Sequence, residues 1–112
     1  MTDVPDVLMV FVTAGNAEEA SMIGQTLVEE KLIACVNIIP RIRSIYWWKG
    51  EICKEEEHLL LMKTRSSLFP SLKDRVRELH SYEVPEITAI PIAHGLPEYL
   101  EWVVENTRRS AE

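Results

Sequence analysis

The sequence contains few of the residues that build phosphate-binding loops or disulfide frameworks. Its 4 glycines are not clustered, which excludes a glycine-rich loop that cradles phosphate. With 2 cysteines no disulfide framework can form, so we expect reduced thiols and a cytoplasmic protein. No apolar run approaches the roughly 20 residues that a membrane span needs. Residues 1–6 lack a basic region before an apolar stretch, so we expect no signal peptide.

Basic residues are also in the minority. Against 12 Lys and Arg stand 18 Asp and Glu, which gives a formal charge of −6 and an isoelectric point near 5.1. An acidic chain without a basic stripe argues against nucleic acid or an anionic membrane as the main partner. Hydrophobic residues make up 46% of the chain and charged residues 27%, which is typical of a folded globular protein. The length predicts one domain over residues 1–112.

Hydrophobic periodicity predicts an alternation of strands and helices. Apolar runs rich in strand-forming residues predict four strands, and apolar residues at helical spacing predict three helices. The predicted strands cover residues 7–13, 33–48, 51–64 and 87–92, and the predicted helices cover residues 17–32, 66–79 and 97–107. The order β-α-β-β-α-β plus a last helix predicts an α+β, ferredoxin-like fold with a mostly antiparallel sheet and two helices on one face.

The first strand and the first helix have clear local signals. Residues 7–13 form a continuous apolar run, so we interpret them as a strand buried on both faces. Asn16 is a favoured helix N-cap residue, and Glu19 three positions later completes a capping box. These two residues predict where the first helix begins.

The two middle strands are unusually long. Each would span roughly 45–50 Å, whereas a compact domain of this length has a diameter of roughly 35 Å, so the tip should project from the domain. The large apolar residues of the tip are Ile45, Tyr46, Trp47, Trp48 and Ile52. Exposed aromatic residues on an unpaired ribbon favour aggregation, so we expect other copies of the chain to cover them in a closed homo-oligomer. The alternative is a bend at Pro40 that folds the ribbon back onto its own domain.

A turn at residues 49–50 sets the register of this hairpin. The expected partners are Trp48 and Glu51, Tyr46 and Cys53, Arg43 and Glu56, Arg41 and His58, and Cys35 and Thr64. The two thiols then lie roughly 35 Å apart, which excludes an intrachain disulfide. A bulge at Pro40 would shift some of these pairs by one residue.

Recognised catalytic and metal-binding motifs are absent from the sequence. The three histidines, His58, His80 and His94, are scattered, and no HxH, HExxH or CxxC spacing occurs. Cys35 lies in an apolar strand, which favours a small core residue over a reactive thiol. We interpret the acidic run 55–57 as a solvated face. No nucleophile elbow or Ser-His-Asp order is present, so no catalytic residue is predicted.

The segment 80–86, between the second helix and the last strand, has more versatile chemistry. His80 could bind a metal or titrate, Tyr82 could donate a hydrogen bond, and Glu83 and Glu86 could accept one. The alternative is a connecting loop whose polar groups face water, and both interpretations stay open.

Several segments resemble the CutA divalent-cation tolerance family. They are residues 34–40 (ACVNIIP), 44–52 (SIYWWKGEI), 62–64 (MKT), 80–87 (HSYEVPEI) and 99–102 (YLEW). The resemblance runs from about residue 8 to residue 102. It implies a ferredoxin-like fold, a homotrimer in which long hairpins pair between subunits, a PII-like assembly with clefts between subunits, and no enzymatic activity.

The resemblance also implies a candidate copper site. Its ligand pattern in bacterial members is a cysteine on the first strand and two adjacent histidines after the second helix. Val12 occupies the cysteine position and Leu79 the first histidine position, so His80 alone matches. Cys35 matches a family cysteine and is the second candidate ligand. No cofactor is required, and Cu²⁺ or another divalent cation is the candidate ligand.

Together these observations predict a non-enzymatic, trimeric protein of divalent-cation tolerance. A trimer would carry three times the formal charge of −6 per chain and would attract divalent cations. The predicted ligand cleft between subunits contains Trp48, Lys63, His80, Tyr82, Glu83 and Trp102. The alternatives are a PII-like small-molecule sensor that uses the same cleft and a scaffolding trimer.

Overall fold

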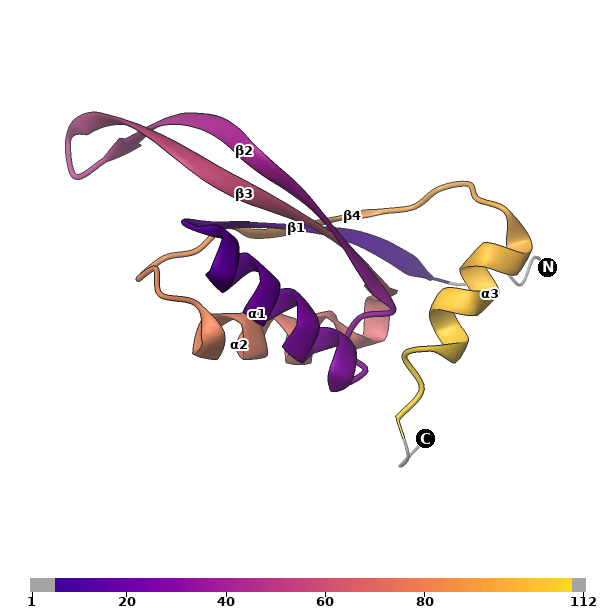
Figure 1. The fold of residues 1–112 in the computed structure, drawn as a ribbon. Coiled ribbons are helices and arrows are strands. Elements are labelled where there is room, and N and C mark those ends of the chain that lie inside the picture. The colour runs from indigo at the N-terminus through magenta and orange to yellow at the C-terminus, as the bar shows by residue number, and fades with distance from the viewer. Residues whose placement is uncertain (1–5, 110–112) are drawn as a thin grey trace.

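A computed structural model describes residues 6–109 and has the predicted order of elements (Figure 1). The strands are β1 (Val7–Ala14), β2 (Cys35–Trp48), β3 (Glu51–Arg65) and β4 (Ile87–Pro91). The helices are α1 (Ala17–Glu29), the short 3₁₀ helix η1 (Ser66–Leu68), α2 (Phe69–Leu79) and α3 (Pro97–Glu105). Residues 1–5, for which no signal peptide is expected, lie outside the described range.

The four strands form one sheet with the order β2-β3-β1-β4. All three neighbouring pairs are antiparallel, so the predicted ferredoxin-like fold is confirmed with a fully antiparallel sheet. Helices α1 and α2 lie side by side against one face, and α3 lies beyond one end of the sheet (Figure 1). Among residues 6–109, no helix is long and apolar enough to cross a membrane.

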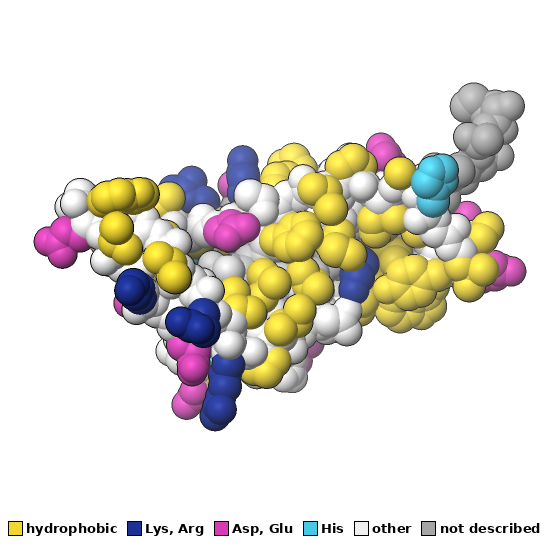
Figure 2. All heavy atoms as spheres, turned by 90° about the horizontal axis from the view of Figure 1, so that it is seen from above, with side chains coloured by type: hydrophobic (Ala, Val, Ile, Leu, Met, Phe, Trp, Pro, Cys, Tyr) yellow, Lys and Arg dark blue, Asp and Glu magenta, His cyan; other side chains and the backbone are white. Residues whose placement is uncertain are grey.

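The strand β1 is buried on one face and half-covered on the other. Val10 and Val12 are fully buried in the core that the sheet forms with α1 and α2. Met9 and Phe11 alternate with them and are only half-buried, because no helix covers their side of the sheet. Within one chain, the prediction of burial on both faces is therefore wrong. Apolar side chains gather over this uncovered face (Figure 2).

At the start of α1, one of the two hydrogen bonds of the predicted capping box is present. Asn16 Oδ1 accepts a hydrogen bond of 2.8 Å from the backbone N–H of Glu19, which confirms the N-cap. The Glu19 carboxylate does not return to Asn16. It accepts hydrogen bonds from the backbone N–H of Ser81 at 2.6 Å and from the Ser81 hydroxyl at 3.0 Å. Glu19 therefore connects the loop after α2 to the first turn of α1 by hydrogen bonds.

The hairpin of β2 and β3 projects beyond the rest of the sheet, as its length predicts (Figure 1). Strand β1 pairs with β3 only as far as His58, so residues 42–57 form a two-stranded ribbon without a third strand. The longest dimension of the molecule is 49 Å, and the Trp47 side chain near the tip is 71% exposed. The chain does not fold back at Pro40, so its own domain leaves the tip uncovered.

A bulge at residues 40–41 divides the register of the hairpin. Toward the tip, the predicted pairs of Trp48 with Glu51, Tyr46 with Cys53 and Arg43 with Glu56 are confirmed. On the other side of the bulge Cys35 pairs with Lys63, so the predicted partner Thr64 is wrong. Arg41 lies in the bulge opposite His58 and forms no regular ladder pair. The reason is local: Pro40 has no N–H for the ladder, and Arg41 takes a positive φ of 60° that removes it from regular pairing.

Candidate functional site

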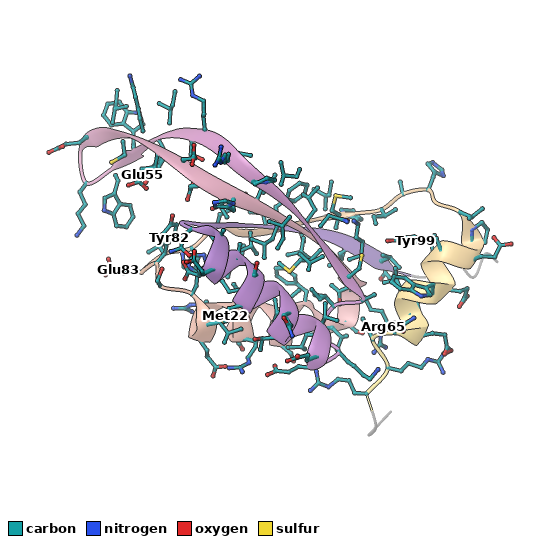
Figure 3. All side chains as sticks on the ribbon, viewed as in Figure 1. Met22, Glu55, Arg65, Tyr82, Glu83 and Tyr99 are labelled. Atoms are coloured by element: carbon teal, nitrogen blue, oxygen red, sulfur yellow. The ribbon has the colours of Figure 1, made fainter. Side chains whose placement is uncertain are left out.

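A groove of about 850 Å³ lies between the projecting ribbon and the loop after α2. β1 contributes Phe11 and Thr13, the ribbon contributes Tyr46, Trp48, Glu55 and Glu57, and the loop contributes Tyr82, Glu83 and Glu86. Glu55 on the ribbon and Tyr82 and Glu83 on the loop lie around this region in Figure 3. Three of the predicted cleft residues, Trp48, Tyr82 and Glu83, therefore line one groove within a single chain.

Two tyrosine hydroxyls in the groove donate to two carboxylates of β3. Tyr82 donates to Glu57 Oε2 at 2.7 Å, and Tyr46 donates to Glu55 Oε1 at 2.8 Å. Burial, followed by the hydrogen bond to Glu57, raises the pKa of Tyr82 well above its ordinary value. The hydrogen bond to Glu55, followed by desolvation, raises the pKa of Tyr46 to about 12. Both hydroxyls stay protonated near neutral pH, so the groove presents oxygen acceptors to any ligand.

His80 lies beneath the groove rather than in its wall. It is 8% exposed, and its Nε2 lies 2.6 Å from the carbonyl oxygen of Thr13. Its Nδ1 accepts a hydrogen bond of 3.1 Å from the backbone N–H of Tyr82. This pattern fits the neutral ring with the proton on Nε2. Both ring nitrogens are thus engaged within the chain and hold the start of the loop against β1.

A second cluster lies where α3 meets the sheet. Cys35 Sγ lies 3.6 Å from the Tyr99 hydroxyl, and the Tyr99 and Trp102 rings stack with their centroids 5.6 Å apart. The hydrogen bond with Cys35, followed by burial, raises the pKa of Tyr99 to about 12. Lys63, the register partner of Cys35, donates a hydrogen bond to Asn37 Oδ1. Predicted residues Cys35, Lys63 and Trp102 therefore belong to this cluster and do not line the groove.

The two clusters are separated along the sheet. Cys35 and Lys63 lie level with Met9 of β1, whereas His80 binds Thr13, four residues further along the same strand. Four residues of strand span ~13 Å, so His80 and Cys35 of one chain cannot share a metal ion. Within residues 6–109, no group of three or more His, Cys, Asp or Glu side chains could hold a metal ion.

The two residues that stand in place of expected copper ligands belong to the hydrophobic core or pack against it. Val12 is fully buried, and Leu79 packs against the same core cluster. Sequence reasoning missed Tyr46, Glu55 and Glu57 as groove residues. Strand alternation was the signal that could have found them, because Glu55 and Glu57 share a face of β3 and the register places Tyr46 beside them.

Comparison with known proteins identifies the family of the chain. The sequence pattern of the family described as "CutA1 divalent ion tolerance protein" matches residues 8–106. The chain belongs to this family. The "Divalent-cation tolerance protein CutA" of Thermus thermophilus is 54% identical over 99 residues, which cover 88% of this chain and 96% of that protein. Human "Protein CutA" is 50% identical over 97 residues, and the chain spans 54% of its length.

Solved structures of CutA proteins have the same fold. The structure of the Thermus thermophilus divalent cation tolerance protein superposes with a TM-score of 0.89 at 52% identity and covers 91% of this chain and 99% of that chain. The CutA1 structure from Oryza sativa gives a TM-score of 0.92 at 42% identity and covers 97% of this chain and 100% of that chain. The resemblance found in the sequence is thus confirmed for family and fold.

Proposed function

We propose that this CutA chain is a non-enzymatic, cytoplasmic protein that acts in tolerance of divalent cations, with Cu²⁺ or another divalent ion as its ligand. The observation that carries the proposal is the family match over residues 8–106, with relatives named divalent-cation tolerance proteins. The charge of the groove supports it. Glu55, Glu57, Glu83 and Glu86 line the groove, and Arg43 is the one basic residue of the described chain that does so. Such a groove concentrates cations from solution.

Metal binding at His80 requires a local rearrangement. The Nδ1 lone pair is engaged by the Tyr82 N–H, so an ion at this nitrogen must displace that hydrogen bond. The other metal ligands would not include Cys35 of the same chain, because Cys35 lies in the cluster near α3. We therefore expect weak binding that is coupled to movement of the loop, micromolar at best.

Titration calorimetry with Cu(II) tests this assignment. We expect His80→Ala and His80→Gln to abolish this micromolar binding. His94→Ala, which changes a histidine in the loop before α3, should leave it unchanged. The glutamine variant keeps a group that can donate to the Thr13 carbonyl, so it separates loss of a ligand from loss of folding. A titration that His80→Gln leaves unchanged would show that His80 is not a ligand.

We also propose that the chain assembles as a homotrimer through its hairpins. A two-stranded ribbon is marginally stable alone, and the tip and the outer face of the sheet expose apolar surface. A cleft that joins the two clusters would take Trp48, Tyr82 and Glu83 from one subunit and Lys63 and Trp102 from another. Native mass spectrometry and sedimentation of the wild type and Trp47→Glu test the assembly. A stable wild-type monomer at low concentration contradicts it.

A second candidate function is a small-molecule sensor. The observation that favours it is the groove itself, whose volume of about 850 Å³ lies in the range of small-molecule sites and whose walls include aromatic side chains. Thermal-shift screening of metabolites and nucleotides against metal salts separates the two candidates, because a ligand of the folded protein raises the melting temperature. If neither class shifts it, a scaffolding role is favoured.

A further inference from the structure

We propose that Glu57 of each subunit forms an ion pair with Lys63 of the partner subunit, so that a second copy of the chain completes the groove beside Glu57. The proposal rests on the homotrimer proposed above and names a charged contact that would join its subunits. Its support is the pattern of side chains on the uncovered face of the sheet, the partners that the two charges have, and their separation within one chain.

Glu57 and Lys63 lie on the same face of β3. Side chains alternate along the strand, and the residues between Leu59, Leu61 and Lys63 are buried in the core with α1 and α2. Glu57, Leu59, Leu61 and Lys63 therefore point to the opposite face, which no helix covers and where apolar side chains gather (Figure 2). This face has a negative charge at one end, two half-buried leucines in the middle and a positive charge at the other end.

Such a face is complementary to a second copy of itself. When two copies meet head-to-tail, the end with Glu57 of one copy meets the end with Lys63 of the next, and leucines become buried between them. Burial of the apolar middle favours association, and the charges select which ends meet. Because the contact joins two different ends, it can repeat around a closed ring and give every Glu57 and every Lys63 a partner.

Glu57 has a neutral partner and no counter-charge in its own chain. It is 6% exposed, and its Oε2 accepts a hydrogen bond of 2.7 Å from the Tyr82 hydroxyl. Within residues 6–109 it forms no ion pair, and Arg43, which also lines the groove, has Glu56 as its register partner. An ammonium group that donates to Oε1 would supply the counter-charge while Tyr82 keeps its hydrogen bond.

Lys63 likewise has a neutral partner. Its side chain is half-buried, and its Nζ donates a hydrogen bond to the amide oxygen of Asn37. An ammonium group has three donors, so others stay available for a carboxylate, and none lies within ion-pair distance in the described part of the chain. Six residues of strand separate Lys63 from Glu57 of the same chain, which is ~20 Å, so the carboxylate would come from another chain.

The ion pair would unite the two clusters of the single chain. Lys63 of the partner subunit would enter the groove beside Tyr82 and bring Trp102 of the cluster near α3 close to it. Glu55, Glu83 and Glu86 would still line the groove, so its attraction for divalent cations does not depend on Glu57.

Charge reversal in the full chain tests the ion pair. Sedimentation and native mass spectrometry measure the protomer concentration at which half of the chains assemble, in a fixed urea concentration that brings the wild type into range. We expect Glu57→Lys and Lys63→Glu each to raise this concentration by about tenfold or more, because each places like charges together. The double variant should return it to within about threefold of the wild type. The matched control is Glu56→Lys, on the opposite face, which should change it by less than about threefold.

Neutral variants keep the proposal testable if a reversed charge prevents folding. Glu57→Gln should weaken assembly of the wild type by about fivefold but should not weaken the Lys63→Met protein further, because its partner charge is already absent. A monomeric wild type would overturn the homotrimer and this contact together. An assembled wild type overturns this contact alone if the folded double variant does not regain assembly, or if Glu57→Gln acts equally in both backgrounds.

Discussion

The hydrogen bond between Tyr82 and Glu57 should be a measurable part of the stability of this protein. Tyr82→Phe removes the hydroxyl that donates to Glu57 Oε2 at 2.7 Å and leaves a carboxylate that is 6% exposed without a donor from its own chain. Hydrogen bonds to charged groups contribute ~1.5–3 kcal/mol. Because the Tyr82 side chain is only half-buried, we expect a loss of about 1.5–2 kcal/mol in the free energy of unfolding.

Urea unfolding at one fixed protomer concentration measures this loss. The comparison includes Tyr82→Phe, Glu57→Gln and the double variant. If the two groups stabilise the fold through each other, the coupling energy of this cycle should be about 1 kcal/mol. Tyr46→Phe is the control, because its hydroxyl donates to the exposed Glu55 and should contribute less.

The pH dependence of the stability difference between the wild type and Tyr82→Phe tests the same hydrogen bond. The pKa of Tyr82 is raised in the folded protein, so its contribution to stability is complete below the ordinary tyrosine pKa of 10.0. It is lost as the pH rises through the folded-state pKa. The difference between the wild type and Tyr82→Phe should therefore stay constant from pH 7 to 9 and shrink in strong alkali. Additive single variants, with a coupling below ~0.3 kcal/mol, would refute the reasoning.

Further predictions concern α1 and its contacts. Arg75 on α2 binds Glu30 through its Nε and Nη2, both at 2.9 Å, and this lowers the pKa of Glu30. Glu30→Gln should therefore lower stability slightly at pH 7, and urea unfolding should show the difference vanish as the pH falls below the ordinary carboxyl value of 4.5. Gly24 lies in the middle of α1, where a Cβ would meet Val36 Cγ1 at 3.0 Å. Gly24→Ala should therefore fail to stabilise the wild type but should raise the stability of Val36→Ala by ~0.5–1 kcal/mol in the same assay, and equal effects in both backgrounds would contradict this.

The order of elements and the projecting hairpin could be predicted because their signals are local. Apolar alternation and the turn at residues 49–50 fix the pairs near the tip, such as Arg43 with Glu56. The pairs on the other side of Pro40 could not be fixed. Whether a proline is absorbed as a bulge depends on the neighbouring strand, and here residues 40 and 41 together stand opposite one residue.

The candidate site was harder to predict because loop side chains follow no period. The loop 80–86 was found from its composition, but no local pattern shows that His80 turns inward to the Thr13 carbonyl. The interpretation of residues 55–57 as a solvated face is wrong for Glu57, which is 6% exposed and accepts a hydrogen bond from Tyr82, a residue 25 positions away in the sequence. Lys63 and Trp102 entered the predicted cleft because polar and aromatic groups are dense around the helix and hairpin ends, and the single chain places them at the other cluster.

The bulge at residues 40–41 also determines which side chains of β2 share a face with the groove carboxylates of β3, because one extra residue exchanges the two faces of the strand. Before it, the odd-numbered residues of β2 share the face of Leu59, and after it the even-numbered residues do, including Tyr46 and Trp48. An unbroken ladder would instead have placed Arg43 directly opposite Glu55 and Ile45 directly opposite Cys53. Deleting Arg41 should preserve the pairing toward the tip, because the turn at residues 49–50 fixes that pairing. The bulge thus lets the two halves of β2 present opposite faces while β3 runs straight through.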